Sequence, residues 1–453
     1  MIKFLIKKIT PKSLLLFYHK CLAYLAAFFY GWPSRKMIVI GVTGTGGKST
    51  VVSLIGRILE EAGYKVGWAS TLNFKIAEKE WLNTLKMTMP GRFVLQKMLK
   101  QMLKAGCQYA IIETSSEGIV QSRHLGIDYD VAVFTNLTPE HIESHGSFEA
   151  YRAAKGELFK KLKIKNQKLK IIDGKEIKKV IVVNLADENA HYFLQFPADE
   201  YYGFAIKSVR MYTNDSQRIK KIIAENIKLN QNSSEFNINN SYFKISLLGQ
   251  FNVENSLAAI AVALSQGINL EICQRALEKI KSIPGRLEIV IDKPFQVIVD
   301  YAHTPDSLEK VYQLLTSLKN PESKIIAVLG SAGGGRDKWK RPKLGALAAK
   351  YADDIIITNE DPYDEDPEEI IKQVAEGAKN TSLNQRKSLS IYEILDRKEA
   401  IKKVISLAKE GDIIIITGKG CEQWIMGPKG KKIPWDDRKV VREIFYDRDI
   451  PQK

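Results

Sequence analysis

The feature that most constrains this chain is a glycine-rich stretch at residues 37–50, MIVIGVTGTGGKST. Residues 38–40 are apolar and predict a short buried strand, and residues 51–62 have helical spacing. A strand, a glycine loop and a helix in this order are typical of a phosphate-binding unit, because glycines let backbone N–H groups turn toward phosphate oxygens. The loop is expected to comprise Gly44, Thr45, Gly46, Gly47, Lys48, Ser49 and Thr50.

Two residues of this loop carry most of its chemistry. Lys48 supplies a charge for the outer phosphates, and the hydroxyl of Ser49 can ligate Mg²⁺. The loop is a variant, because the usual spacing puts a first glycine at position 42, which is Val42 here. A glycine-rich turn with a chance lysine is the alternative, and the strand before and helix after the loop argue against it.

Length and charge bound the class of protein. With 453 residues the chain is long enough for two or three domains. Its net charge of +16 favours anionic partners, namely nucleotides, nucleic acid or an anionic membrane. Its four cysteines lie far apart, which indicates a reducing compartment and argues against a disulfide framework or a zinc site.

Residues 1–36 combine a basic start with an apolar stretch at residues 14–30, which His19 and Lys20 interrupt. A secretory signal would need a small-residue cleavage site, and export would place an ATP site outside the cell. A spanning helix needs about 20 apolar residues, and a charge near the middle opposes it. We therefore expect a helix that packs on the body or lies on a membrane surface, and the pattern leaves both open.

From residue 37 onward, strands alternate with helices, which predicts a mostly parallel sheet. Glu113 ends an apolar strand, where a carboxylate beside a phosphate loop commonly holds Mg²⁺; capping of the next turn is the alternative. His141 and His145 follow the strand predicted at residues 131–137, at the sheet edge where ligands bind. Lys155 has small neighbours in the helix predicted at residues 148–162, which leave room around it.

The next segment, residues 160–248, predicts a peripheral and partly β elaboration. A helix is then expected at residues 256–266. Asn252 and Asn255 precede it, and their amides can contact a purine edge or cap the helix. A boundary near residues 282–285 begins a second α/β domain, whose strand ends deliver further polar residues to one sheet edge.

Nine motifs in this chain occur in the order found in Mur ligases: GTGGKST, ETSSEG, NLTPEHIESHG, YRAAKGELF, GQFNVEN, PGRLE, VDYAHTPDSLEK, GRDKWKRP and ITGKGCE. Residues 37–453 thus resemble that family, and most closely its muramoyl-tripeptide synthetase branch. The resemblance implies an α/β fold with a central phosphate-loop ATPase domain with a mostly parallel sheet (37–282) and a C-terminal Rossmann-like domain (283–453). The short helical N-terminal segment (1–36) is expected from its own apolar pattern.

The resemblance also implies a reaction and its partners. ATP phosphorylates the terminal carboxylate of a (UDP-)muramoyl-peptide, and the amine of an amino acid attacks the acyl phosphate to give an amide, ADP and phosphate. Two Mg²⁺ ions stabilise the charge during transfer. It further implies a cytoplasmic enzyme of peptidoglycan precursor synthesis without a nucleic-acid partner. Residues 1–34, which the resemblance does not cover, offer a peripheral membrane contact through their basic start and apolar stretch.

Site roles transfer to this chain motif by motif. Lys48, Ser49, Glu113, His141 and Lys155 match the catalytic and metal-binding residues, and Lys155 matches a lysine that carries a carbamate. The nucleotide would be met by Asn252, Asn255, Arg286 and Asp300 in addition to the loop. The muramoyl-peptide would be met by Thr88, Ser115 and Arg123, and the amino acid by Arg336, Tyr363, Gly418 and Glu422.

The chain also departs from the family pattern. Gly46 replaces an asparagine of the loop, Glu117 a histidine, and Cys421 another histidine, while Met89 replaces a threonine. An ordinary UDP-binding domain needs roughly 80 residues or more, and 36 precede Met37. We therefore expect either that a UDP group is held differently or that the substrate carries none.

Two other functions remain as alternatives at this point. One is a ligase similar to folylpolyglutamate synthase, which shares the ATPase core. The other is a non-catalytic, ATP-gated binding protein. For the amino acid, Tyr363 stands where enzymes that add meso-diaminopimelate resemble one another in having arginine. Because Asp364, Glu365 and Asp366 follow, we expect a negative pocket that disfavours diaminopimelate and favours a distal ammonium, as in lysine.

Overall fold

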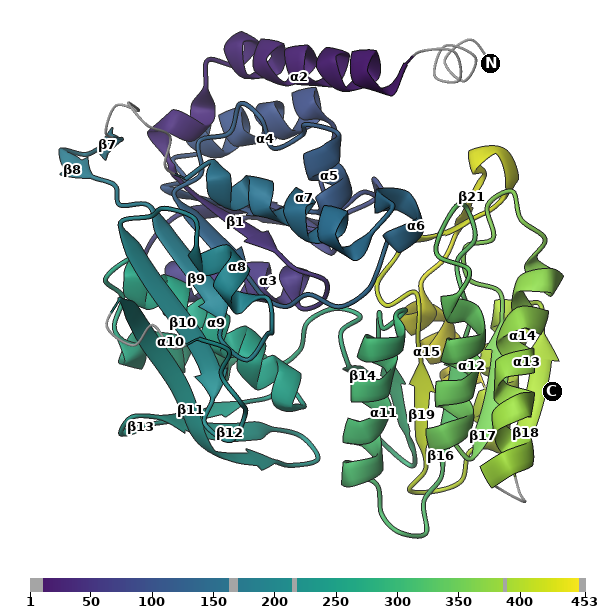
Figure 1. The fold of residues 1–453 in the computed structure, drawn as a ribbon. Helices are drawn as coiled ribbons and strands as arrows, with labels where there is room; N and C mark the ends of the chain where they lie inside the picture. Colours follow the sequence, from purple (N-terminus) through teal and green to yellow (C-terminus); the bar gives the residue numbers. More distant parts are fainter. Residues whose placement is uncertain (1–10, 163–169, 214–217, 386–388, 448–453) are drawn as a thin grey trace.

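A computed structural model of the chain describes residues 11–162, 170–213, 218–385 and 389–447. Two α/β domains lie beside each other, and one helix from the N-terminal region covers the first of them (Figure 1). This confirms the predicted fold class, with a large, mostly parallel sheet and a second sheet in the C-terminal part.

The first domain is built on an eleven-stranded sheet in the order β13-β12-β11-β10-β9-β6-β1-β5-β2-β3-β4. Its strands from β11 to β2 in this order are parallel, and antiparallel strands extend it at both ends. The strands are β1 (Ile38–Thr43), β2 (Val66–Ala69), β3 (Asn73–Ile76), β4 (Lys79–Leu82), β5 (Tyr109–Glu113), β6 (Val131–Phe134), β9 (Val180–Asn184), β10 (Glu200–Ile206), β11 (Ile219–Leu229), β12 (Ser234–Ile238) and β13 (Ser241–Ile245).

Helices cover both faces of this sheet and bury two separate apolar cores. One face carries α3 (Lys48–Glu61), α9 (Gln250–Ser265) and α10 (Leu270–Lys279). The other face carries α4 (Arg92–Lys104), α7 (Phe148–Lys160) and α8 (Ala190–Leu194), with the short helices α5 (Ser116–Val120) and α6 (Ile142–His145) at its edge. Burial on both faces explains why the central strands read as continuous apolar runs.

Two predictions about this domain need correction. The segment predicted to be peripheral contributes β9 and β10 to the sheet itself, beside β6, although β7 (Ile171–Ile172) and β8 (Lys175–Glu176) do form a separate hairpin. The helix expected at residue 256 begins at Gln250, after Gly249 in a left-handed conformation (φ +91°). Asn252 and Asn255 therefore lie inside its first turns.

The second domain is a six-stranded sheet in the order β14-β15-β19-β16-β17-β18, parallel except for β14. Helices on both faces bury an apolar core on each side. The elements are β14 (Glu288–Ile291), β15 (Gln296–Val299), α11 (Pro305–Leu318), β16 (Ile325–Leu329), α12 (Lys340–Tyr351), β17 (Asp354–Thr358), α13 (Pro367–Gln385), β18 (Ser390–Ile394), α14 (Arg397–Leu407), β19 (Ile413–Ile416), the hairpin β20 (Trp424–Met426) and β21 (Lys432–Pro434), and α15 (Asp437–Asp447).

Helix α2 (Lys12–Phe29) lies across α4 and is followed by the 3-10 helix η1 (Pro33–Lys36) (Figure 1). Ala23, Ala26 and Ala27 are buried, so a stripe of small residues makes the contact. The opposite face exposes large apolar side chains, namely Leu14, Phe17, Tyr18, Leu25, Phe28 and Phe29. Among the described helices, none combines the length and apolar character that crossing a bilayer requires.

Candidate active site

One cavity of about 330 Å³ lies between the two domains, and every predicted site residue is on its wall. The first domain contributes the loop after β1 and the ends of β5 and β6, and the second contributes the loops after β15, β16, β17 and β19. These are carboxyl ends of parallel strands, where open α/β sheets bind ligands. The cavity thus joins residues separated by as many as 380 positions, from Gly44 to Trp424.

The glycine loop forms a cradle that other residues would fill. A Cβ atom at Gly44 would lie 1.9 Å from Oγ1 of Thr135, and one at Gly47 would lie 2.2 Å from Oδ1 of Asn255. Gly47 has a left-handed backbone (φ +79°) and precedes α3, so the N–H groups of that helix start face the cavity. This geometry fits the phosphates of a nucleotide.

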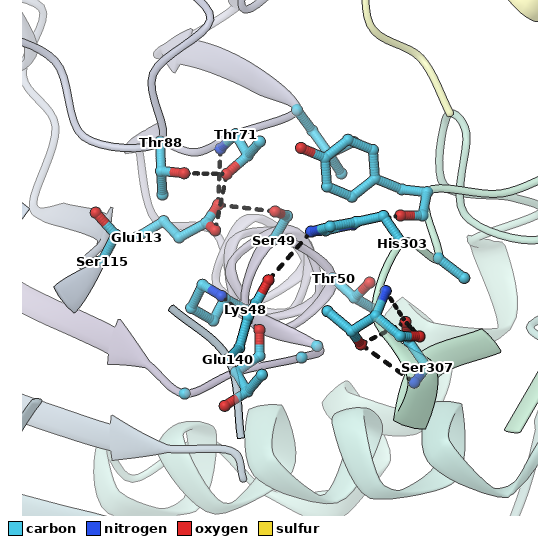
Figure 2. A pocket seen from close by; sticks show the side chains of 18 of the residues that line it. Lys48, Ser49, Thr50, Thr71, Thr88, Glu113, Ser115, Glu140, His303 and Ser307 are labelled. Atoms are coloured by element: carbon cyan, nitrogen blue, oxygen red, sulfur yellow. Dashed lines mark hydrogen bonds and ion pairs between the residues drawn. The ribbon is translucent and has the colours of Figure 1, made fainter. Parts of the chain in front are cut away.

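Lys48 and Ser49 begin α3, directly beneath this cradle (Figure 2). The Nζ atom of Lys48 donates to the carbonyl oxygen of Thr45, 2.7 Å away, which keeps the charge over the loop. The hydroxyl of Ser49 donates to Oε2 of Glu113 over 2.8 Å. A hydroxyl and a carboxylate in contact beside a phosphate cradle match the few protein ligands that Mg²⁺ uses with nucleotide phosphates.

Glu113 is buried at the end of β5, as its position in the sequence predicts. Its carboxylate also accepts hydrogen bonds from the backbone N–H and the hydroxyl of Thr71, at 2.7 and 2.9 Å. The Thr71 hydroxyl in turn accepts from the hydroxyl of Thr88, 2.9 Å away (Figure 2). These contacts fix the orientation of the carboxylate and connect it to the predicted substrate residue Thr88.

Lys155 is a buried cation with an unusual environment. Its side chain is 1% exposed, and its Nζ donates to the carbonyl oxygen of Gly44 over 2.7 Å and lies 4.3 Å from the centre of the Tyr151 ring. Burial, reinforced by the charge of Lys48, holds the pKa of the Lys155 ammonium well below its usual range. The amine is therefore more readily neutral than that of an exposed lysine.

Around His141 the structure gathers residues that the sequence did not single out. Oε1 of Glu140 lies 3.3 Å from Nε2 of His303 and 3.7 Å from Nε2 of His141. Burial opposes ionisation of Glu140, but the hydrogen bond to His303 and the charge of His141 hold its pKa well below its usual range. Burial lowers the pKa of His141 and favours its neutral form, which is the form that ligates metals.

The sequence pattern alone does not predict this arrangement. Glu140 is adjacent to His141, but a neighbouring acid has no characteristic spacing, and His303 comes from the other domain. His145, also noted from the sequence, instead lies 3.1 Å from the hydroxyl of Ser116. Over the described part of the chain, no three His, Cys, Asp or Glu side chains converge as a metal site. A bound ion would therefore need ligands from phosphates or from a modified Lys155 as well.

The residues predicted to contact the nucleotide mostly make contacts with other protein groups. Nδ2 of Asn255 donates to Oδ1 of Asn252, and Nδ2 of Asn252 donates to the carbonyl oxygen of Leu248. The guanidinium of Arg286 lies 4.4 Å from the centre of the Tyr301 ring and reaches the Ser49 hydroxyl at 3.4 Å. Arg286 thus connects the second domain to the phosphate loop.

Two further predicted residues shape loops at this cavity. Asp300 accepts hydrogen bonds from the backbone N–H groups of Leu287 and Ala302, both at 2.7 Å. Ser115 caps α5 by accepting from the N–H of Gly118. Arg123 donates to the carbonyl oxygen of Met89, so it supports the loop that carries Thr88.

The pocket predicted for the amino acid is lined by Arg336, Tyr363, Gly418 and Glu422. The Tyr363 ring packs on Gly334, where a Cβ atom would lie 2.6 Å from it. The guanidinium of Arg336 lies 3.7 Å from the carboxylate of Glu117, the residue that replaces a family histidine. Negative charge reaches the pocket from Asp361 and Glu422.

The three acids after Tyr363 do not supply that charge, and this part of the prediction was wrong. Glu365 pairs with Arg341 at 2.9 Å. Asp364 and Asp366 accept backbone hydrogen bonds from Lys429 and Glu368. None of the three acids lines the cavity. Asp361 was not singled out because its role depends on residues from both domains.

The chain matches two consecutive domains of one protein family. Residues 42–263 match the Mur ligase middle domain, and residues 285–420 match the Mur ligase, glutamate ligase domain. These boundaries agree with the division between the two sheets.

Curated relatives and solved structures agree with this match. The chain is 37% identical over 94% of its length to a UDP-N-acetylmuramyl-tripeptide synthetase of Roseiflexus sp. and covers 82% of that protein. It is 36% identical over 95% of its length to a UDP-N-acetylmuramoyl-L-alanyl-D-glutamate–2,6-diaminopimelate ligase of Halalkalibacterium halodurans, of which it also covers 82%. A solved structure of another such diaminopimelate ligase matches with a TM-score of 0.58 at 29% identity, over 91% of this chain and 79% of the other. The chain therefore belongs to the Mur ligase family and is an ATP-dependent, amide-bond-forming ligase of peptidoglycan precursor synthesis.

Proposed function

We propose that this ligase joins the terminal carboxylate of a muramoyl-peptide to the amine of an incoming amino acid. The observation that carries the proposal is the single cavity that holds the phosphate loop, Glu113, Lys155 and the Asp361–Glu422 pocket together. The relatives' names describe ligases that act on UDP-muramoyl peptides. Their agreement with the Mur ligase domains favours this function over the folylpolyglutamate and binding-protein alternatives.

The reaction uses ATP and Mg²⁺, which turn a poor electrophile into an activated carboxylate that an amine can attack. In this chain the glycine cradle and Lys48 would hold the nucleotide phosphates, and Ser49 and Glu113 would hold the ion. The hydrogen bonds from Thr71 hold the Glu113 carboxylate in place beside Ser49 and so fix where the ion would be bound.

Lys155 would act as a carbamate and hold a second Mg²⁺ together with His141. A lysine amine must be neutral to react with carbon dioxide, and the burial of Lys155 favours its neutral form. A carbamate would replace a buried cation beside Lys48 by an anion, which relieves the repulsion between the two lysines. Glu140 would keep His141 oriented toward the cavity.

For the incoming amino acid, we propose one without a distal carboxylate. Tyr363 is uncharged and cannot form the bidentate pair that arginine makes with a carboxylate. Asp361 and Glu422 give the pocket acceptors for a cation, which favours a distal ammonium, as in lysine. The Halalkalibacterium relative is named for diaminopimelate, so the substrate proposed for this chain differs from the one in that relative's name.

We place the protein in the cytoplasm, where ATP is supplied, with α2 resting on the inner face of the membrane. The exposed face of α2 carries Phe17 and Phe28, which are 63% and 73% exposed. The sequences of α2 and α4 contain no acidic residue, and the first acid of the chain is Glu60. An apolar, aromatic face in a basic surrounding suits an anionic bilayer surface.

The direct test measures phosphate release with a panel of UDP-muramoyl-peptides and amino acids in the presence of ATP and Mg²⁺. We expect release that needs both an acceptor peptide and an amino acid, with an amide product detected by mass spectrometry. Phosphate release that no acceptor in the panel stimulates would contradict the proposed reaction.

A further inference from the structure

A lysine from the first domain enters the amino-acid pocket of the second. Lys86 lies in the loop between β4 and α4, and its Nζ is 2.7 Å from Oδ2 of Asp361 and also contacts Oε2 of Glu422. Lys419 approaches the same two carboxylates, at 2.8 Å from Asp361 and 2.7 Å from Glu422. Two cations and two anions thus alternate in one largely buried cluster.

The two lysines are not held equally. Lys419 belongs to the same loop as Glu422 and is completely buried, and its pKa is raised by the two carboxylates despite the cost of burial. Lys86 comes from another domain, and burial together with the charge of Lys419 lowers its pKa. Its backbone is left-handed (φ +56°), a conformation that non-glycine residues rarely adopt. Leu85 and Met87 on either side are each 38% exposed. Lys86 is therefore the member of the cluster that is easier to withdraw.

The charges of this cluster indicate what must replace Lys86 when it leaves Asp361 and Glu422. Asp361 and Glu422 carry two negative charges, and Lys419 compensates one of them. One further cation satisfies the pair, whereas two further cations would place three positive charges against two negative ones in a poorly hydrated pocket. A ligand ammonium and Lys86 therefore compete for the same two carboxylates.

We propose that Lys86 is an internal substitute for the distal ammonium of the incoming amino acid, and that this ammonium must displace Lys86 from Asp361 and Glu422 to bind. This inference rests on the proposed function, which places the amino acid in this pocket. It gives Lys86 a role in specificity: a distal ammonium takes over the two carboxylates from Lys86, whereas a neutral amino acid binds with Lys86 left in place.

Displacement of Lys86 would also affect the loop that is predicted to contact the muramoyl-peptide. The Lys86 loop continues to Thr88, whose hydroxyl donates to that of Thr71, and the Thr71 hydroxyl donates to Glu113. Asn83 fixes the base of the same loop by donating to the carbonyl oxygens of Ser70 and Met87. Movement of Lys86 is thus transmitted along a short segment that ends beside the phosphate loop.

The test compares L-lysine with L-norleucine, which has the same chain but no distal ammonium. Lys86→Met removes the charge and keeps most of the length of the side chain. Lys432→Met is the matched control, because Nζ of Lys432 bridges the same loop to the second domain through the carbonyl oxygen of Thr84, 3.5 Å away, outside the acid pair. The readouts are KM for each amino acid and for ATP in phosphate release.

We expect Lys86→Met to lower the KM for lysine about tenfold, the usual size of a coupling that a ligand must overcome. The KM values for norleucine and ATP should not change, and Lys432→Met should leave all three KM values as they are. An unchanged ratio of the lysine and norleucine KM values would overturn the inference. A similar loss of kcat with both amino acids would also overturn the inference, because it would indicate that Lys86 is a fixed structural contact between the two domains.

Lys86→Arg keeps the inference testable if the methionine variant does not fold. Arginine retains the charge and pairs bidentately with carboxylates, so it should raise the KM for lysine and leave that for norleucine unchanged. An unchanged lysine KM in this variant overturns the inference. A wild-type enzyme that uses no amino acid of the panel refutes the proposed function itself, a result distinct from an active wild type whose Lys86 variants behave normally.

Discussion

The side-chain nitrogen of Lys155 lies 2.7 Å from the carbonyl oxygen of Gly44, so helix α7 and the phosphate loop are in direct contact. The contact is buried, and it places the lysine beside Lys48 and in the same cavity as Glu113. A cation in this position repels Mg²⁺, whereas a carbamate on the same nitrogen would ligate it. Three consequences can be measured.

Lys155→Ala should abolish ligation and recover part of it when short-chain carboxylic acids are added, because a free carboxylate can occupy the space of the carbamate. The carbamate itself should be visible by carbon-13 spectroscopy after incubation with labelled bicarbonate. Lys160→Ala, on an exposed position of the same helix, is the control. An active Lys155→Ala variant would contradict the role.

Carbamylation should depend on pH with a definite sign. Since the pKa of Lys155 is lowered, its amine becomes neutral at a lower pH than that of an ordinary lysine. Acidification through this lowered pKa protonates the amine, and the carbamate and the activity should then disappear together. A labelled signal that persists unchanged after the pH falls below the activity limit would argue against a carbamate at this residue.

Lys48→Ala should reduce kcat by about 10²- to 10³-fold, the usual effect of removing one electrostatic contact to a developing charge. The Lys48 ammonium donates to the carbonyl oxygen of Thr45 within its own loop, so folding should be little affected by its loss. Lys65→Ala, on an exposed residue after α3, controls for loss of one positive charge. Near-normal turnover with an unchanged Tm would remove the phosphate loop from the mechanism.

Membrane contact is best tested without deleting α2. Ser34, directly after this helix, accepts from the N–H of Asp128 and from Lys170, so a deletion of residues 1–34 would also disturb the body. Phe17→Ser with Phe28→Ser leaves the buried alanine stripe intact and should abolish binding to anionic vesicles. Tyr242→Ser, exposed on the remote strand β13, is the control. Equal vesicle binding by all variants would rule out this face.

The sequence was most informative where the chemistry is local. The strand, loop and helix around Lys48 follow from apolar spacing and glycines, and the carboxylate of Glu113 follows from its place at a strand end. The carboxyl ends of parallel strands lie at one edge of a sheet, so residues that follow these strands line one cavity, together with Lys155 from α7 and Asn252 and Asn255 from α9.

Pairings between distant segments could not be predicted in this way. Nothing in the local pattern of β9 distinguishes an inner strand from an added hairpin, because that depends on its pairing with β6. Glu140 acquires its role from His303, and Asp361 from Lys86, in each case across the two domains. The prediction for the acids after Tyr363 was wrong for the same reason, namely that their partners lie in distant segments. Arg341 and the backbone of Lys429 hold these acids away from the pocket.

The choice of amino acid is the sharpest remaining prediction. Tyr363 stands where the resemblance to diaminopimelate-adding enzymes leads us to expect arginine, and burial together with the charge of Asp361 raises the pKa of its hydroxyl, which favours the uncharged ring. The missing charge-assisted pair is worth about 1.5–3 kcal/mol, or roughly a tenfold to hundredfold preference. We therefore expect kcat/KM for lysine to exceed that for meso-diaminopimelate, with ornithine between them.

Tyr363→Arg should shift this preference toward diaminopimelate, because the guanidinium supplies the fork that a distal carboxylate needs. Its control is Tyr446→Arg, which adds the same charge at a residue that is 60% exposed on α15. A clear preference of the wild type for diaminopimelate would contradict both the exclusion of that substrate and the choice of lysine. A preference for a neutral amino acid would contradict only the choice of lysine, because Tyr363 excludes a carboxylate whether or not Asp361 and Glu422 receive a cation.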